Sequence, residues 1–402
     1  MRNILGQRPL RFVFAANVIS MLGSGMNSAA VAWYILEATH SEMALGTFAV
    51  LQTIPAMLML PFTGVIIDRE DRRLLVMWLD ALRAAIIVGV AVLAFRHRAQ
   101  IWELYLMNTL VAAGFWMFWP TITALIQELT PEGQFVQSNT FLLAGVQGGW
   151  LIAGALVGFL YNHIGLGGVL LIDVSTYVVS FLCYFAVRKG RHVVLRPEEL
   201  RADILAAETQ FQRFWREMRE GLHFLGAHRA VILLGISWAL FLGAMITGVV
   251  VTPSLSERVF HAGAVGYGWL NAGWGTGAFL SALYAPAIIA ACVVCAPVSH
   301  WLVAGILVYA VMGSARGVGG IAMNTSLMEM VPPHLMGRVQ NTFYFFGTFL
   351  QLVLAVAVGA VAHRVSLVAA FAILSLVYGG SFVAASWPVG TVTAEEARVE
   401  LS

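Results

Sequence analysis

Charged side chains are scarce in this sequence. Lys, Arg, Asp and Glu together make up 11% of its 402 residues, whereas an ordinary soluble domain has about 25%. So little charge cannot cover the surface of a water-soluble globule of this size, which excludes a soluble enzyme, a disordered chain and a coiled coil. The formal net charge is only +2, so no basic face is spare for nucleic acid.

Cysteine and the familiar catalytic signatures are also scarce. The three cysteines stand in apolar stretches and give no disulfide framework. Cys292 and Cys295 form a C-x-x-C, but without a second pair or a nearby histidine they indicate packing rather than a metal site. No phosphate-cradling G-x-x-x-x-G-K-[ST] supports direct use of ATP, and neither a nucleophile elbow nor a zinc-protease signature is present. We therefore expect no enzyme activity, no metal and no cofactor.

Long apolar segments are abundant, since hydrophobic residues make up 59% of the chain. The segments are long enough to span a bilayer as helices, and the segment 264–297 is longer than one span needs. They lie at roughly 12–36, 43–67, 74–95, 101–127, 138–161, 166–187, 230–252, 264–297, 301–330, 339–362 and 366–387. The pattern predicts an all-α polytopic membrane protein with an N-terminal six-helix half (1–187), a cytoplasmic linker (188–229) and a C-terminal half with a short tail (230–402).

Basic residues predict the orientation of these spans. With the N-terminus inside, the inner segments hold 17 Lys and Arg residues and the outer segments hold 4, as the positive-inside rule requires. Both termini and the linker are then cytoplasmic, which requires an even number of spans. The first apolar stretch is too long for a signal peptide, so we interpret it as the first span.

The linker contains one amphipathic stretch, at 208–226. Its apolar residues recur at helical spacing, with Arg and Glu on other faces. This pattern is typical of a helix on the inner membrane surface. A helix that binds a partner protein is the alternative.

The two halves share a repeated segment. Residues 123–141 align with 325–343 at an offset of 202, and 44–46 align with 264–266 at an offset of 220. The second half is therefore about 18 residues short between these anchors, and we place the gap after Tyr284. A natural deletion and an omitted loop both remain open.

The segment GVIIDREDRR (64–73) joins the second and third spans on the inner face. It resembles the signature loop of the major facilitator superfamily, G-x-x-x-D-R-x-G-R-R/K, with Asp71 in place of the second glycine. The matching residues are Gly64, Asp68, Arg69, Arg72 and Arg73. The resemblance implies two six-helix halves that rock around a central cavity, with these residues as a gate in which Asp68 holds guanidinium groups of an adjacent helix. A plain topology signal is the alternative.

Other stretches, such as 20–35, 77–84, 129–140 and 317–340, are similar to the branch of macrolide-efflux and enterobactin-exporter-like proteins. That resemblance implies export of small amphipathic molecules. The exporters' fifth-span element, G-x-x-x-G-P-x-x-G-G, is only partly present. Gly145, Gly149 and Gly154 align, whereas Trp150 replaces the proline and Ala153 replaces a glycine. Generic glycine packing explains the same residues.

Polar and aromatic stripes mark the helices that would line a cavity. Arg316 stands out because a charge near the membrane midplane is costly and by default functional. It would bind an anionic group or pair with a carboxylate. The substrate-binding candidates are Asn17, Ser24, Asn27, Trp116, Trp119, Asn271, Trp274, Arg316, Asn324 and Tyr344. For each of them, hydrogen bonding between helices without substrate contact is the alternative.

The resemblance also implies proton coupling, with the proton gradient as the energy source. The candidate acids are Asp80, Asp173, Glu128 and Glu329. Asp80 and Arg83 stand three apart and would pair on one helix. Asp173 lies deep in the sixth span, which in this family usually packs outside the cavity.

These features together predict a secondary active transporter in a prokaryotic cytoplasmic (inner) membrane. We expect it to exchange protons for a small amphipathic compound such as a drug, macrolide or siderophore-like molecule, as a monomer in the lipid bilayer. Uptake or lipid flipping by the same fold is the first alternative. A membrane scaffold or sensor is a remote one.

Overall fold

The computed structural model describes residues 6–69, 71–96, 98–131, 134–187, 210–279, 301–313, 331 and 333–386. Over these residues the chain is helical, with no strand. The helices are α2 (Arg8–Thr39), α3 (Glu42–Arg69), α4 (Arg72–Phe95), α5 (Ile101–Leu129), α6 (Phe135–Ala186), α8 (Gln210–Ala227), α9 (Arg229–Arg258), α10 (Gly263–Phe279), α13 (Pro333–Arg364) and α14 (Leu367–Ser386). A shorter apolar helix covers Leu302–Gly313. The predicted all-α membrane fold is confirmed, since seven of the described helices are long and apolar enough to cross a membrane.

Local signals explain where these helices begin and end. Asp71 caps α4, its side chain accepting hydrogen bonds from the main-chain N–H groups of Arg73 and Leu74. Gln100 and Glu103 form a reciprocal capping box at the start of α5. His40 ends α2 in the left-handed region, with φ at 48°. The breaks between apolar segments therefore coincide with chemically capped helix ends.

Helix α6 contains the fifth and sixth predicted spans without an intervening loop. Its two arms meet at Gly165, which has φ at 65° and ψ at −176°. Only glycine adopts that conformation without strain. The boundary predicted between 161 and 166 is thus a kink of one residue rather than a separate turn.

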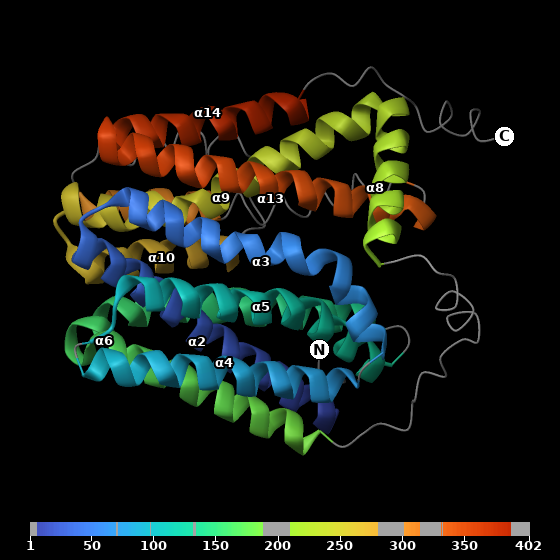
Figure 1. Ribbon diagram of the computed structural model, residues 1–402, viewed down its shortest axis with the longest axis horizontal. Coiled ribbons are helices and arrows are strands. Elements are labelled where there is room, and N and C mark those ends of the chain that lie inside the picture. Colours follow the sequence, from blue (N-terminus) through green and yellow to red (C-terminus); the bar gives the residue numbers. More distant parts are fainter. Residues whose placement is uncertain are drawn as a thin grey trace.

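Most helices lie along the long axis of the molecule, and α8 crosses them at one end (Figure 1). Helix α2 packs against α6, α4 packs against α5 and α6, and α3 packs against α5. We call α2 to α6 the N-terminal group. Helices α9, α13 and α14 pack together as the C-terminal group, with α10 against α9. The groups meet where α3 contacts α13 and where α10 contacts α6. The domain boundaries at 187 and 229 stay predictions.

The two ends of this bundle differ. The α8 end carries the turn between α3 and α4, and the opposite end carries Glu42 at the start of α3 (Figure 1). We call these the α8 end and the Glu42 end. The arginine distribution predicts that the α8 end is cytoplasmic and the Glu42 end external.

The flanks of the bundle expose large apolar side chains. Trp78 on α4 is 73% exposed and Leu376 on α14 is 76% exposed. Leu182 and Phe185 on α6 are also exposed. Such a belt is what acyl chains cover in a polytopic membrane protein.

Helix α8 covers the stretch in which the sequence predicts an amphipathic helix. Met218 and Leu225 are buried, and the ring of Trp215 meets that of Phe345 on α13 edge-on at 6.2 Å. One face of α8 therefore docks on the C-terminal group. Its position at the membrane surface stays a prediction.

Candidate functional site

A buried polar network connects α2, α4 and α6 inside the N-terminal group. Its charged members, Asp80, Arg83 and Asp173, are at most 1% exposed. Charges this deep inside membrane-spanning helices are rare and by default functional. The network consists of Ser24 and Asn27 on α2, Asp80 and Arg83 on α4, and Asp173, Tyr177 and Ser180 on α6.

Asp80 and Arg83 form an ion pair, as their spacing predicts. Arg83 Nη2 lies 2.5 Å from Asp80 Oδ1, and the Ser180 hydroxyl donates to the other carboxylate oxygen at 2.6 Å. The guanidinium lies between two rings, 4.6 Å from the centroid of Phe118 and 4.5 Å from that of Tyr177. The charge of Asp80 is thus matched by a cation that is itself tightly enclosed.

Asp173 has a different environment. Asn27 Nδ2 donates to Asp173 Oδ2 at 2.7 Å, and the Thr176 hydroxyl lies 3.4 Å from Oδ1. In the part of the chain that the structure describes, no basic side chain forms an ion pair with Asp173. Gly23 lies opposite, where an added Cβ would collide with Asp173 Oδ1 and Thr176 Oγ1. Neutral donors therefore hold the carboxylate. The space that it occupies is open because residue 23 is a glycine and has no Cβ.

Helix α2 presents further polar groups along the same face. The Ser24 hydroxyl bonds to the Tyr177 hydroxyl at 2.9 Å, and Arg83 Nη1 donates to that hydroxyl at 3.5 Å. Asn17 and Ser20 are fully buried, and their side chains find no hydrogen-bond partner among the described residues. Buried polar groups without partners are costly, so Asn17 and Ser20 are candidates to bind a ligand.

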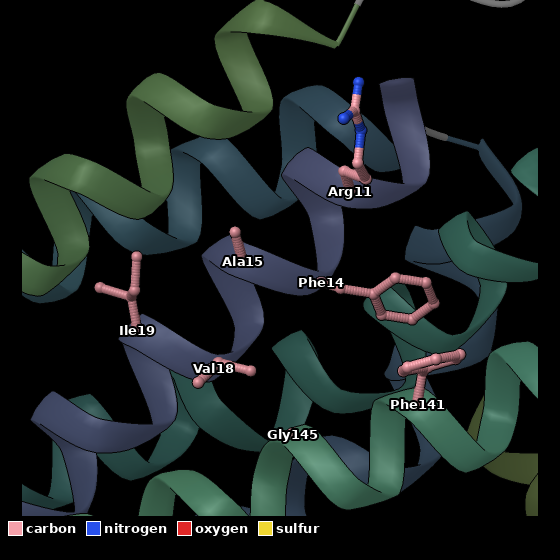
Figure 2. Close-up of a pocket in the computed structure, with 7 residues that line it drawn as sticks. All are labelled: Arg11, Phe14, Ala15, Val18, Ile19, Phe141 and Gly145. Atoms are coloured by element: carbon pink, nitrogen blue, oxygen red, sulfur yellow. The ribbon is translucent and has the colours of Figure 1, made fainter. Parts of the chain in front are cut away.

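An apolar pocket of about 480 Å³ lies between α2 and the first arm of α6. Figure 2 shows its lining, with Phe14 and Phe141 at one side and the Arg11 guanidinium directed away from the two rings. The lining residues are Arg11, Phe14, Ala15, Val18, Ile19, Phe141 and Gly145. None of the predicted substrate-binding residues lines it.

The remaining substrate-binding candidates lie on separate helices. Trp116 and Trp119 are partly buried on α5, and Asn271 donates to the Tyr267 carbonyl within α10 at 2.9 Å. Trp274 packs against the main apolar core, whereas Tyr344 on α13 is 44% exposed. Arg316, Asn324 and the acid Glu329 lie outside the described residues, as does the predicted gap after Tyr284. Of the substrate-binding candidates that the structure describes, Ser24 and Asn27 are the two that belong to the polar network.

The predicted gate lies at the α8 end. Gly64, Asp68 and Arg69 belong to the last turns of α3, and their side chains lie outside the description. Arg72 Nη1 pairs with Glu128 Oε2 at 3.5 Å, and Arg73 donates to the carbonyls of Tyr184 and Phe185, each at 2.7 Å. The start of α4 is therefore tied to the ends of α5 and α6. Glu128, a proton-coupling candidate from the sequence, serves here as the partner of Arg72.

The N-terminal and C-terminal groups touch along two seams with close backbone contact. A Cβ on Gly46 of α3 would lie 2.8 Å from the Ala355 carbonyl of α13. At the second seam, a Cβ on Gly154 of α6 would lie 2.7 Å from the main-chain nitrogen of Ala272 of α10. Gly145 and Gly149 instead face α2, near Val18 and Met21. All three glycines of the fifth-span element therefore admit a neighbouring helix.

Sequence reasoning missed an ionic cluster at the Glu42 end. Glu42 Oε1 lies 2.8 Å from Arg258 Nη1, and Glu42 Oε2 lies 3.5 Å from His363 Nδ1. The three residues belong to α3, α9 and α13. Sequence spacing does not reveal a cluster assembled from three helix ends.

The family model of the Major Facilitator Superfamily matches residues 13–339. The chain belongs to the Major Facilitator Superfamily. Macrolide efflux protein A of Streptococcus pyogenes is 22% identical over 249 residues, which are 62% of this chain and 59% of that protein. The putative bacilysin exporter BacE of Bacillus amyloliquefaciens is 28% identical over 205 residues, 50% of this chain and 48% of that protein.

A crystal structure of a POT family transporter in complex with 5-aminolevulinic acid has the same fold. It superposes with a TM-score of 0.68 at 12% identity, covering 94% of this chain and 95% of that one. The family and the fold are therefore those of multi-pass membrane transporters, which are not enzymes. The matches to the macrolide and bacilysin proteins span only about half to three fifths of their lengths.

Proposed function

We propose that this chain is a proton-driven exporter of a small amphipathic compound, working by alternating access across a prokaryotic cytoplasmic membrane. The observation that carries the proposal is the Asp173 carboxylate, fully buried and hydrogen-bonded to Asn27 of α2. Relatives named for efflux and export support the direction. The compound is a drug, macrolide or siderophore-like molecule in this proposal.

Asp173 is the best proton-coupling residue among the described candidates. Asp80 is neutralised by Arg83, and Glu128 pairs with Arg72. Protonating Asp80 would leave a buried cation without its partner, which is costly, and Glu128 lies at the α8 end, where the pair with Arg72 is partly exposed. Asp173 accepts a proton without breaking an ion pair to any described residue. It can therefore load and release protons during a transport cycle.

The bond between Asp173 and Asn27 links that proton to substrate binding. The carboxylate accepts from the Asn27 amide, whereas a protonated acid has a hydrogen of its own to donate. Protonation thus changes which atoms of Asn27 face the interior. Asn17 and Ser24 lie on the same helix, so we propose that α2 presents the substrate-binding residues whose availability the proton controls.

The test compares accumulation of ethidium and erythromycin in cells that express the chain. Wild-type protein is expected to lower accumulation, and a protonophore is expected to reverse the effect. Asp173→Asn should lose this protonophore-sensitive export. In proteoliposomes with the same pH on both sides, it should still exchange labelled probe across the membrane. Glu220→Gln, which alters an acid on α8, is the matched control and should export normally.

Two outcomes would contradict the proposal. Export by Asp173→Asn at the wild-type rate would remove Asp173 from the coupling step. Higher accumulation in expressing cells, collapsed by the protonophore, would identify uptake rather than export.

A further inference from the structure

Three ionisable side chains from three helices meet at the Glu42 end. Glu42 is fully buried, although it stands in the first turn of α3. Its carboxylate contacts Arg258 at 2.8 Å and His363 at 3.5 Å, and both of these side chains are 45% exposed. Arg258 Nη2 also donates to the His40 carbonyl at 3.2 Å. The cluster therefore connects the turn between α2 and α3 with α9 and α13.

The helix ends favour this arrangement of charge. Glu42 lies at the N-terminus of α3, where a helix favours an anion. Arg258 and His363 lie in the last turns of α9 and α13, where a helix favours cations. Each group is thus stabilised by its own helix as well as by its partners. The cluster is also the only described ionic contact that joins the N-terminal and C-terminal groups.

The seam between α3 and α13 runs directly inward from the cluster. A Cβ on Gly359 would lie 3.0 Å from the Glu42 carbonyl and 3.4 Å from the Cα of Gly46. Further along, Gln351 Nε2 donates to the Thr53 hydroxyl. From Glu42 to Thr53 the contact extends over about 16 Å of helix. Opening the Glu42 end along this seam requires separation of Glu42 from Arg258 and His363.

We propose that Glu42, Arg258 and His363 form a proton-sensitive latch that holds the Glu42 end closed. With a neutral imidazole, Glu42 has one cation, Arg258. With a protonated imidazole it has two. Because the carboxylate lies beside His363 only when α3 and α13 are in contact, proton binding to His363 and closure of this end favour each other. Histidine is the side chain that proteins most often use as a proton-sensitive switch, so a proton bound by His363 is the signal that this latch would sense.

The other ionisable groups at this end do not replace His363. Glu42 from α3 faces it, and Arg258 from α9 reaches it through Glu42. The neighbouring α14 carries no acidic or basic side chain over Leu367–Ser386. Arg364 follows His363 in α13, and Glu257, His261 and His40 lie in the adjoining turns. Among the contacts that the structure describes, His363 is the only histidine that contacts Glu42.

The inference rests on the proposed function for its direction. If the Glu42 end faces outside, protons from an acidic exterior close that end and return the empty carrier to the cytoplasmic side. That is the step in which a proton-exchanging exporter moves without substrate. The latch would thus use external acidity to favour the return half of the cycle.

Distances between spin labels test the latch without any substrate. Labels at Thr47 on α3 and Val365 after α13, in a background without native cysteines, report separation of the two helices at the Glu42 end. In this labelled protein in lipid nanodiscs, without further substitutions, the ratio of open to closed populations should rise about two- to fivefold from pH 5.5 to pH 8. A change of this size is expected from one partly exposed ion pair.

Variants at His363 decide whether this residue is the cause. His363→Gln should abolish the pH response and increase the open population, and His363→Arg should keep the end closed at both pH values. Glu42→Gln should increase the open population at both pH values. His163→Gln is the matched control, because the contacts described for exposed His163 are with the Phe159 carbonyl and ring, and it should retain the full response.

A wild-type pH response in His363→Gln would overturn the latch. This readout is independent of transport. Loss of protonophore-sensitive export in the wild-type protein would contradict the proposed function and leave the pH-dependent distances unchanged. Conversely, normal export with pH-independent distances would contradict only the latch.

Discussion

Asn27 of α2 donates a 2.7 Å hydrogen bond to Asp173 of α6, with both side chains buried. The bond joins a helix with unpartnered polar groups, Asn17 and Ser20, to a carboxylate that lacks an ion-pair partner in the described part of the chain. Substrate-binding and proton-binding candidates therefore share one contact rather than occupying distant sites.

Replacing Asn27 should change the pH dependence of transport. Asn27→Leu removes the amide that donates to the charged form of Asp173, which disfavours the carboxylate. We expect the alkaline limb of the flux profile to move toward higher pH. Proton-driven transport in proteoliposomes over a pH series measures this shift. Ser28→Ala, a change on the same helix, should leave the profile in place, and an unmoved profile in Asn27→Leu would contradict the role of the bond.

The pair of Asp80 and Arg83 should be most visible as stability. Arg83→Leu leaves Asp80 buried with only the Ser180 hydroxyl, which should lower stability by about 3–5 kcal/mol. The double variant with Asp80→Asn removes the orphaned charge and should recover a large part of the loss. Thermal unfolding monitored by size-exclusion chromatography compares the variants. A double variant no more stable than Arg83→Leu would show that the loss comes from packing.

Gly46 should be essential for closing the Glu42 end. A leucine there would place Cβ 2.8 Å from the Ala355 carbonyl, so α3 and α13 could not come into contact. Because the closed state would then not form, export should fall at least about tenfold. Gly89→Leu on α4, where nothing lies within 4 Å of the new Cβ, is the control. Export rates normalised to surface expression provide the measurement. Normal export by Gly46→Leu would show that this seam does not need to close.

Asp71 occupies the position of a glycine in the family's signature loop, and the structure shows it capping α4. Asp71→Ala should lower stability by about 1 kcal/mol, whereas Asp71→Gly should lower it by only a few tenths. Asp71→Asn should behave like wild type. Equal losses for alanine and glycine would indicate that contacts other than the cap explain the aspartate.

Features that depend on residues close together in the sequence were predictable. The apolar segments predict the helices, the spacing of three predicts the pair of Asp80 and Arg83, and the polar stripe on α2 predicts the buried side chains of Asn17 and Asn27. Each of these follows from helical periodicity within one span.

Features that need two or more helices were not predictable. Arg72 finds Glu128 on α5, and Glu42 finds Arg258 and His363 on two further helices. No local pattern marks these partners, because helix packing alone determines which ends meet. The family pattern predicts Asp173 outside the cavity, whereas the structure bonds it to Asn27. That bond depends on the missing Cβ of Gly23, which no spacing rule reveals.

The single-residue kink of α6 has a mechanical consequence. One arm of this helix packs Gly154 and Gly158 against α10, and the other arm carries Asp173. Gly165 is the covalent joint between them, so a rotation of the first arm at its contact with α10 reaches the arm that carries Asp173 through the backbone dihedral angles of one residue. The stiffness of that joint, together with the packing of both arms on α2, would set how far a rocking motion at α10 is transmitted to Asp173.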